Sequence, residues 1–169
     1  PRSSSAASDV YKRQIVFGNR NSVEEVEEGD KLQPKFDEKG LIPAITVDIS
    51  SKEILMHGYM NKEALKLSIE TKNAHYWSRS RQSIWKKGEK SGLQQKIKKI
   101  RIDDDQDCII IFVELEGLKA SCHVGYKSCF YRELKSINSK FSDKLVFIEK
   151  EKVFDPEEVY GDIPNPTKL

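Results

Sequence analysis

The apolar residues of this chain of 169 residues fall in short runs rich in β-branched and aromatic side chains, which are typical of strands. Runs of this kind at 41–48 and 53–59 are separated by the polar residues 49–52, and this pattern predicts a β-hairpin. Residues 109–115 are almost continuously apolar, as in a strand that is buried on both faces. Further strands are predicted at 75–78 and 94–102.

One helix is predicted from a clear start. Asn61 can cap it, and Ala64, Leu65 and Ile69 recur at helical spacing, so residues 62–71 should form an amphipathic helix. We find no repeated strand–helix–strand unit that would supply parallel crossovers. The expected fold is therefore α+β, a single domain of mainly antiparallel strands with one helix.

The composition narrows the class of protein. Hydrophobic residues make up 37% and charged residues 33% of the chain, as in a globular domain. No apolar stretch approaches the roughly 18–20 residues that cross a bilayer. Lys+Arg 29 against Asp+Glu 27 gives a net charge of +2, which is too small for a dedicated duplex binder. Three cysteines without a secretory leader favour the cytoplasm, and we expect neither nucleic acid nor membrane as a partner.

The two ends of the chain differ from its middle. The first methionine is Met56, and part of 1–14 matches what one frame of a sequencing-library adapter would encode, so 1–14 is expected to be a disordered assembly scar. Residues 15–35 form an acidic lead-in that could be a short helix or solvated chain. The main domain is expected at 36–150, and 151–169, with three prolines, as a tail on the surface or on a partner.

Residues 103–107 hold four aspartates in five positions. Such a run is costly unless solvent or a cation neutralises it. If the backbone is extended, Asp103, Asp105 and Asp107 point to one face and Asp104 to the other. Three carboxylates on one face suit Mg²⁺, which prefers oxygen ligands. An ordinary acidic loop between strands is the alternative.

Cys122 and Cys129 lie seven positions apart around a glycine-containing turn, and His123 directly follows the first. Thiolates and imidazole are ligands that suit Zn²⁺. Two thiols do not complete a structural site of four ligands, whereas an incomplete protein ligand set is typical of a catalytic zinc with a bound water. A pair of buried free cysteines, or a disulfide, is the alternative, and His123 alone could be a hydrogen-bonded core residue.

Residues 75–81 and 85–92 mix aromatic rings, hydroxyls, fixed cations and glycines. Arginine binds phosphate through two hydrogen bonds, and a glycine-rich turn can present backbone amides to an anion. This mixture suits a phosphorylated nucleotide. A solvated basic strand pair with aromatic cross-strand packing is the alternative.

Taken together and in order, these segments resemble the phosphoribosyl-AMP cyclohydrolase family of histidine biosynthesis. The resemblance covers about residues 36–132. The segments that carry it are Gly40-Leu41-Ile42-Pro43-Ala44, Leu55-Met56 with Tyr59-Met60-Asn61, His75-Tyr76-Trp77-Ser78-Arg79-Ser80-Arg81, Trp85-Lys86-Lys87-Gly88-Glu89 with Ser91-Gly92, the aspartate run, and Ser121-Cys122-His123 with Ser128-Cys129-Phe130-Tyr131-Arg132.

The resemblance implies an intertwined homodimer that depends on Zn²⁺ and Mg²⁺. It implies Asp103, Asp105 and Asp107 as magnesium ligands, and Cys122 and Cys129 as two zinc ligands.

The family's third zinc ligand is a cysteine supplied by the other subunit, and this chain has Asp104 at that position. A carboxylate oxygen is an acceptable zinc ligand at about 2.0–2.2 Å, so we expect Asp104 to complete the site. Cys108 shares its face of an extended strand but lies roughly 13 Å away, too far to replace it without a register change.

The resemblance implies hydrolytic opening of the adenine ring of 1-(5-phosphoribosyl)-AMP, with a zinc-bound hydroxide attacking the carbon beside the ribosylated N1. His123 is expected to take the proton from the water and return it to the leaving nitrogen. Magnesium would help to hold one phosphate. The other substrate contacts are expected from Trp77, Arg79, Ser80, Arg81, Lys87, Gly88, Glu89, Ser91 and Arg132.

Two other kinds of function compete with this one. A zinc-dependent module for single-stranded nucleic acid would stack bases on Trp77 and Trp85 and use the lysines near 96–101, but it leaves the aspartates unexplained. The second is an inactive dimer in which the metal has only a structural role. It is suggested by Asp104, which stands where the family has a cysteine ligand.

Overall fold

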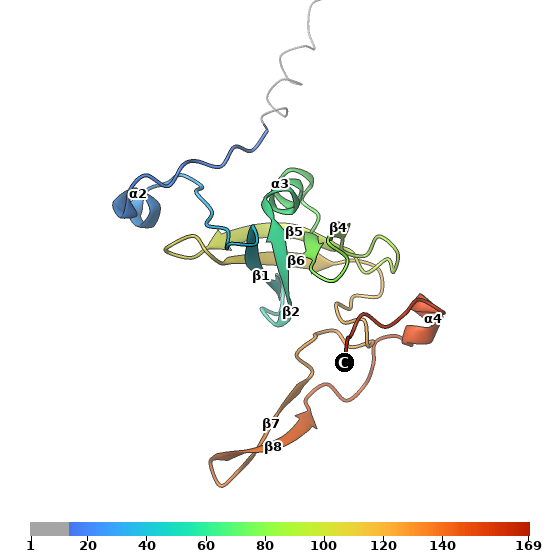
Figure 1. Ribbon diagram of the computed structural model, residues 1–169. Coiled ribbons are helices and arrows are strands. Elements are labelled where there is room, and N and C mark those ends of the chain that lie inside the picture. Colours follow the sequence, from blue (N-terminus) through green and yellow to red (C-terminus); the bar gives the residue numbers. More distant parts are fainter. Residues whose placement is uncertain (1–13) are drawn as a thin grey trace, which may run out of the picture.

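The computed structural model describes residues 14–169, so the expected scar lies outside the described residues except for its last position. A four-stranded sheet forms the centre, with the strand order β2-β1-β6-β5 (Figure 1). The pairs β3–β4 and β7–β8 form two further small sheets. The strands are β1 (Leu41–Asp48), β2 (Ile54–Asn61), β3 (His75–Ser78), β4 (Ser83–Lys86), β5 (Gln95–Ile102), β6 (Ile109–Leu115), β7 (Arg132–Ile137) and β8 (Lys140–Phe147). The helices are α2 (Val23–Glu28), α3 (Lys62–Thr71) and α4 (Pro156–Tyr160).

The predicted β1–β2 hairpin is confirmed, and its turn shows why these residues reverse the chain. The Asp48 carboxylate accepts hydrogen bonds from the backbone N–H groups of Ser50 at 2.8 Å and Ser51 at 3.2 Å. Lys52 then adopts a left-handed conformation with φ 64°. Aspartate favours such turns because its side chain can bond to the backbone a few residues on.

The predicted helix is confirmed as α3. The Asn61 side chain accepts a hydrogen bond from the N–H of Ala64 at 2.8 Å, which satisfies one of the first-turn donors. The helix buries Ala64, Leu65 and Ser68 against the sheet and ends at Lys72, which is left-handed with φ 56°. Its apolar face and the sheet enclose the main core, where Ile42, Leu55, Met60 and Ile111 are among the fully buried residues.

The α+β class with mainly antiparallel strands is confirmed, with one parallel pair that we did not predict. β1 pairs with β6 in parallel, from Ala44 opposite Ile109 to Asp48 opposite Val113. The other strand pairs are antiparallel. Between β1 and β6 the chain passes through four other strands and α3, so no local pattern signals this pairing.

The β7–β8 hairpin extends away from the central sheet (Figure 1). Its apolar side chains are largely exposed, namely Leu134, Ile137, Phe141, Leu145 and Phe147. We did not predict these strands.

Near the other end, Phe154 packs with Leu93 and Ala120, and Tyr160 of α4 lies against this cluster. No helix within residues 14–169 is long and apolar enough to cross a membrane.

Candidate functional site

The two thiols of Cys122 and Cys129 lie within hydrogen-bonding reach of each other. A tight turn brings them together, in which the N–H of Gly125 donates to the carbonyl of Cys122 at 3.1 Å. Gly125 has φ +108°, and a side chain there would meet the carbonyl oxygen of Phe154 at 2.5 Å. A residue other than glycine would therefore displace this thiol loop, which we define as residues 121–129.

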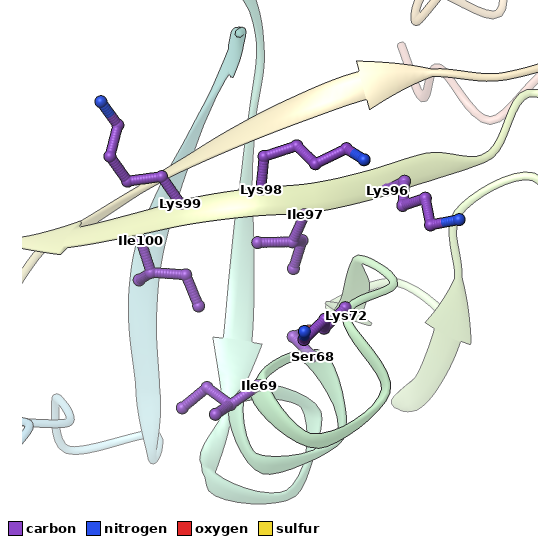
Figure 2. A pocket seen from close by; sticks show the side chains of 8 residues that line it. All are labelled: Ser68, Ile69, Lys72, Lys96, Ile97, Lys98, Lys99 and Ile100. Carbon is purple, nitrogen blue, oxygen red and sulfur yellow. The ribbon is translucent and has the colours of Figure 1, made fainter.

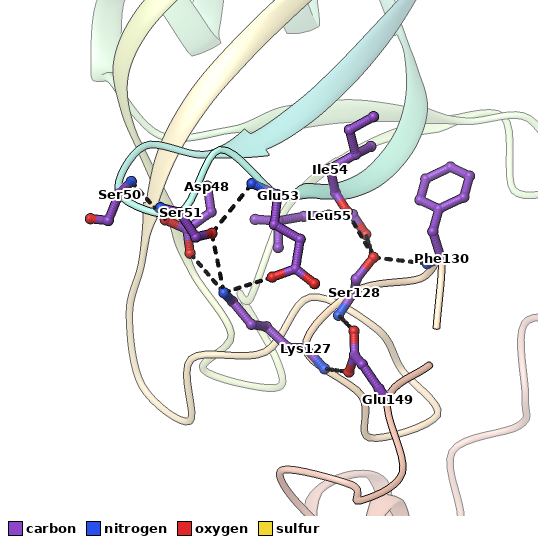
Figure 3. A network of polar contacts seen from close by, with 10 residues as sticks. All are labelled: Asp48, Ser50, Ser51, Glu53, Ile54, Leu55, Lys127, Ser128, Phe130 and Glu149. Carbon is purple, nitrogen blue, oxygen red and sulfur yellow. Dashed lines mark hydrogen bonds and ion pairs between the residues drawn. The ribbon is translucent and has the colours of Figure 1, made fainter. Parts of the chain in front are cut away.

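A polar network fixes the thiol loop to the start of β2 (Figure 3). The Glu149 carboxylate accepts hydrogen bonds from the N–H groups of Lys127 at 2.9 Å and Ser128 at 3.0 Å. The Lys127 amine pairs with Glu53 at 2.8 Å and with Asp48 at 3.3 Å. Glu149 was not predicted to take part, because no local pattern links it to a loop more than twenty residues earlier.

Because the two thiols lie close together, their pKa values shift in opposite directions. The hydrogen bond from Cys129 lowers the pKa of Cys122 below the ordinary thiol range, and the nearby Lys87 amine lowers it further. The same hydrogen bond and burial raise the pKa of Cys129. Cys122 is therefore the more readily ionised of the two thiols, and a metal ion would bind both as thiolates.

Lys87 lies in the interior behind the thiol loop. Its amine donates a hydrogen bond of 2.7 Å to the carbonyl of Ser121 and lies 5.5 Å from the centre of the Trp85 ring. Burial lowers the pKa of this amine, while both cysteines oppose that effect. The positive end of Lys87 therefore faces the thiols rather than solvent.

His123 belongs to the same loop, and one of its ring nitrogens has unusual surroundings. Its Nε2 atom is buried without a hydrogen-bond partner in the described part of the chain. Burial lowers the pKa of His123, against the opposing effect of Asn165. A neutral imidazole with a free nitrogen beside two thiols fits the proton acceptor of a catalytic metal centre.

The aspartate run forms a turn between β5 and β6, so the extended backbone that we assumed for it is wrong. The Asp103 carboxylate accepts hydrogen bonds from the N–H groups of Asp107 at 2.9 Å and Cys108 at 3.0 Å, and Gln106 is left-handed with φ 59°. Alternation of side chains therefore does not apply. Carboxylate oxygens of Asp103, Asp104 and Asp105 all lie within 4.8 Å of one another. Burial and the charges of Asp105 and Asp103 raise the pKa of Asp107.

Gln106, at the centre of this aspartate turn (residues 103–108), was not predicted to matter. It is only 4% exposed, and its side-chain oxygen accepts a hydrogen bond from the N–H of Gln33 at 2.7 Å. Its side-chain nitrogen donates to the carbonyls of Val26 at 3.0 Å and Lys31 at 3.2 Å. The segment around α2 is thus fastened to the turn by one amide.

Within one chain, the thiols and the aspartate turn lie at different levels along the sheet. The N–H of Cys129 donates to Leu55, opposite the end of β1, whereas the aspartate turn precedes Ile109, which is level with Ala44. Leu55 is level with Thr46 and Val47, so two to three residues of strand separate the two levels, or roughly 10 Å at 3.3 Å per residue. Among residues 14–169, no third His, Cys, Asp or Glu ligand atom joins the two thiols.

The nine predicted substrate contacts fall in four places. Trp77 lines a hollow in front of α3. In the β3–β4 turn, Arg79 stacks over Tyr59 at 4.3 Å and the Arg81 Nε donates to the Ser78 hydroxyl at 3.2 Å. Ser80 lies in the same turn. Lys87 contacts the thiol loop, and Gly88, Glu89 and Ser91 follow it in the segment after β4. Arg132 is the first residue of β7.

Known proteins resemble this chain over most of its length. A model of the phosphoribosyl-AMP cyclohydrolase family matches residues 56–131. A phosphoribosyl-AMP cyclohydrolase of Rhizobium leguminosarum bv. trifolii (strain WSM2304) is 45% identical over 149 residues, which are 88% of this chain and 98% of the relative. Relatives of the same name are 50% identical over 130 residues in Methanoregula boonei, with 77% and 96% covered, and 52% identical over 123 residues in Methanosarcina mazei, with 73% and 92% covered.

Proposed function

This chain belongs to the phosphoribosyl-AMP cyclohydrolase family, hydrolases of carbon–nitrogen bonds in cyclic amidines, and we propose that it opens the adenine ring at a zinc site shared between two copies of the chain. The observation that carries the proposal is the contact of the Cys122 and Cys129 thiols beside the unpartnered Nε2 of His123. The family membership favours this enzyme over the nucleic-acid module that the basic segments also allowed.

The donor set of this chain fits zinc. Cys122 and Cys129 would supply two sulfur ligands, and Asp104 of a second copy would supply an oxygen, because Asp104 of the same chain clusters with Asp103 and Asp105 and not with the thiols. Zinc bound there would act as a Lewis acid and lower the pKa of a coordinated water.

His123 has the properties that a general base needs. Because burial lowers its pKa, its ring is neutral near pH ~7 and can accept a proton from the attacking water. The water oxygen bonds to the adenine carbon next to the ribosylated N1, the bond between that carbon and N1 breaks, and His123 returns the proton to the leaving nitrogen.

The aspartate turn supports the proposed magnesium site. Asp103, Asp105 and Asp107 would hold Mg²⁺ through oxygen. Oxygens of Asp103 and Asp105 already lie close together, and burial and the charges of these two aspartates raise the pKa of Asp107. Magnesium held there would help to bind a phosphate of the substrate. Further contacts are proposed from Trp77, Arg79, Ser80, Arg81, Lys87, Gly88, Glu89, Ser91 and Arg132.

The β7–β8 hairpin supports the intertwined homodimer. Phe141 is 78% exposed and Ile137 is 53% exposed, on an arm that extends away from the central sheet. An exposed apolar surface of this kind is typical of a protein–protein interface. We place the enzyme in the cytoplasm, where the three free cysteines of the described chain stay reduced.

Metal analysis combined with a ring-opening assay tests the proposal. The purified protein should contain zinc and change the ultraviolet absorbance of phosphoribosyl-AMP, and a chelator should abolish the change until zinc and magnesium are returned. Asp104→Ala should lose zinc on dialysis, whereas Asp30→Ala, at an exposed position after α2, should retain it. Full activity in metal-free protein, or unchanged zinc in Asp104→Ala, would contradict the shared site.

A further inference from the structure

We propose that the hollow in front of α3 is a subsite for a phosphate monoester of the nucleotide substrate, with Lys39, Lys62 and Lys66 as its cations. This inference rests on the proposed function, because it assigns the substrate phosphate that the aspartate turn does not hold. None of the three lysines was among the predicted substrate contacts.

The hollow has a volume of about 540 Å³. Three segments that are far apart in the sequence meet there: the residues before and at the start of β1, the β2–α3 junction, and the end of β3. Its lining is Lys39, Gly40, Leu41, Asn61, Lys62, Glu63, Lys66 and Trp77. Trp77 offers an aromatic surface beside the cations, so the hollow combines the two features that bind a nucleotide phosphate and its base or sugar.

The positive charge of the hollow is largely uncompensated. No ion pair within residues 14–169 includes Lys39, Lys62 or Lys66, and Glu63 is the single acid among the lining residues. Lys62 and Lys66 are four residues apart on α3, so their like charges repel across one turn. They also stand at the helix N-terminus, the positive end of the helix dipole. A phosphate dianion would relieve this repulsion.

A second hollow is also lined by lysines, but its lysines differ from those of the first hollow in their partners. It lies between α3 and β5, and in the close view the Lys98 and Lys99 side chains point away from the Ile97 and Ile100 side chains that face the helix (Figure 2). Lys98 pairs with Glu114 at 2.9 Å, and Lys99 lies 4.5 Å from the centre of the Phe112 ring. In the first hollow Lys66 has a similar aromatic neighbour, 5.7 Å from the centre of the Phe17 ring. The second hollow, however, has lysines that are already in ion pairs, so it is a weaker candidate for an anion.

The lysine hollow and the aspartate turn lie at the same edge of the sheet. Leu41, at the hollow, is three residues before Ala44, and the aspartate turn directly precedes Ile109, which pairs with Ala44. Asn61 pairs with Leu41 on the other side. Neighbouring strands are about 4.8 Å apart, so hollow and turn are separated by roughly one or two strand spacings. A nucleotide with two ribose phosphates can span that separation.

Binding and kinetics of lysine variants test the subsite in the full chain loaded with zinc and magnesium. AMP should bind by calorimetry and adenosine should bind at least about tenfold more weakly, because only AMP carries the phosphate. Lys62→Ala and Lys66→Ala should each weaken AMP binding and raise KM for phosphoribosyl-AMP by about tenfold, with little change in kcat and in magnesium affinity. Lys39→Ala should act in the same direction. Lys98→Ala is the matched control and should change neither quantity.

The outcomes separate this inference from the proposed function. Ring opening with unchanged KM and unchanged AMP affinity in all three variants overturns the subsite and leaves the enzyme assignment intact. Absence of ring opening in the wild-type chain, with AMP affinity that still depends on Lys62 and Lys66, overturns the assignment and supports the subsite. Unfolding midpoints of the variants, compared with that of Lys98→Ala, show whether a loss of binding is a loss of fold.

Discussion

The three histidines of this chain have different surroundings. His57 packs edge-on against Tyr59, with ring centres 4.9 Å apart, and the His75 Nδ1 hydrogen-bonds the carbonyl of Asn73 at 2.8 Å. His123 alone has a buried ring nitrogen without a partner among the described residues. An unpaired buried polar atom costs free energy, so its retention indicates use in binding or catalysis.

Replacing His123 by alanine should therefore lower turnover without releasing the metal. We expect kcat to fall by about 10²- to 10⁴-fold, the usual contribution of a positioned general base. Zinc content after dialysis should stay near that of the wild type, because the proposed ligands remain. Steady-state kinetics and metal analysis on the same preparation check this prediction, and wild-type turnover in the variant would remove His123 from the mechanism.

A second residue-scale prediction concerns pH and Asp48. Burial alone would raise the pKa of Asp48, but hydrogen bonds from Ser50 and Ser51 and the Lys127 amine lower it below its ordinary value. A carboxyl whose pKa is lower in the folded state contributes stability above its unfolded pKa of about 3.9, and that contribution is lost as pH falls through the folded pKa.

Asp48→Asn keeps an acceptor for both N–H groups but removes the charge, so it should lower the free energy of unfolding by about 1 kcal/mol near pH ~7. The difference from the wild type should shrink towards zero near pH ~2. Urea unfolding at both pH values measures it. Asp37→Asn is the matched control, because the Asp37 carboxylate also accepts two backbone hydrogen bonds, from Lys39 and Leu41, but has no lysine partner in the described chain. A penalty that is equal at both pH values would rule out the charge as its cause.

At the scale of elements, the sequence patterns predicted correctly those strands and helices whose formation depends on local interactions. β6 and α3 have the predicted bounds, since one is an unbroken apolar run and the other has its own cap in Asn61. The β7–β8 strands were missed because their apolar residues are exposed and alternate poorly with polar ones. The aspartates were predicted to form a cluster. The turn that brings them together depends on the left-handed conformation of Gln106, which no pattern in the sequence predicts.

The part of the site that escaped prediction is made by long-range contacts. Gln106 reaches residues about seventy to eighty positions earlier, and Glu149 reaches back to Lys127 and Ser128. A polar residue that acts through tertiary contacts produces no periodic pattern in the sequence. From the sequence alone it cannot be told from an ordinary surface residue.

Gln106→Ala should loosen the segment around α2 and the aspartate turn together. The carbonyls of Val26 and Lys31 and the N–H of Gln33 lose their partner, at a cost of about 1–3 kcal/mol in the free energy of unfolding. Amide hydrogen exchange should become faster at Gln33 and in the turn, while the β1–β2 hairpin stays protected. Gln82→Ala is the control, because Gln82 is also left-handed with φ 50° but exposed. Unchanged exchange at Gln33 would show that the hydrogen bonds of the Gln106 side chain are not needed to hold the segment around α2.

At the scale of the whole molecule, the shared site makes a prediction about mixed assemblies. Asp104→Ala and His123→Ala chains should each be nearly inactive alone. A dimer of one of each contains one site with an intact thiol loop from the first chain and an intact Asp104 from the second. Random pairing makes half of the dimers mixed, so refolding an equimolar mixture should restore roughly a quarter of wild-type activity.

Activity assays after joint refolding, compared with separate refolding followed by brief mixing, check this prediction. A matched mixture of His123→Ala with Cys122→Ala should stay inactive, because both changes fall in the same thiol loop and no mixed site is intact. If the first mixture also stays inactive, the site is contained within one chain.

The separation of the thiol loop from the aspartate turn along the central sheet has a kinetic consequence. In the proposed assembly no chain carries a working centre until it meets another, so catalytic output per chain declines on dilution below the dissociation constant of the pair. The initial rate then grows with the square of the protein concentration when the solution is dilute and linearly when it is concentrated.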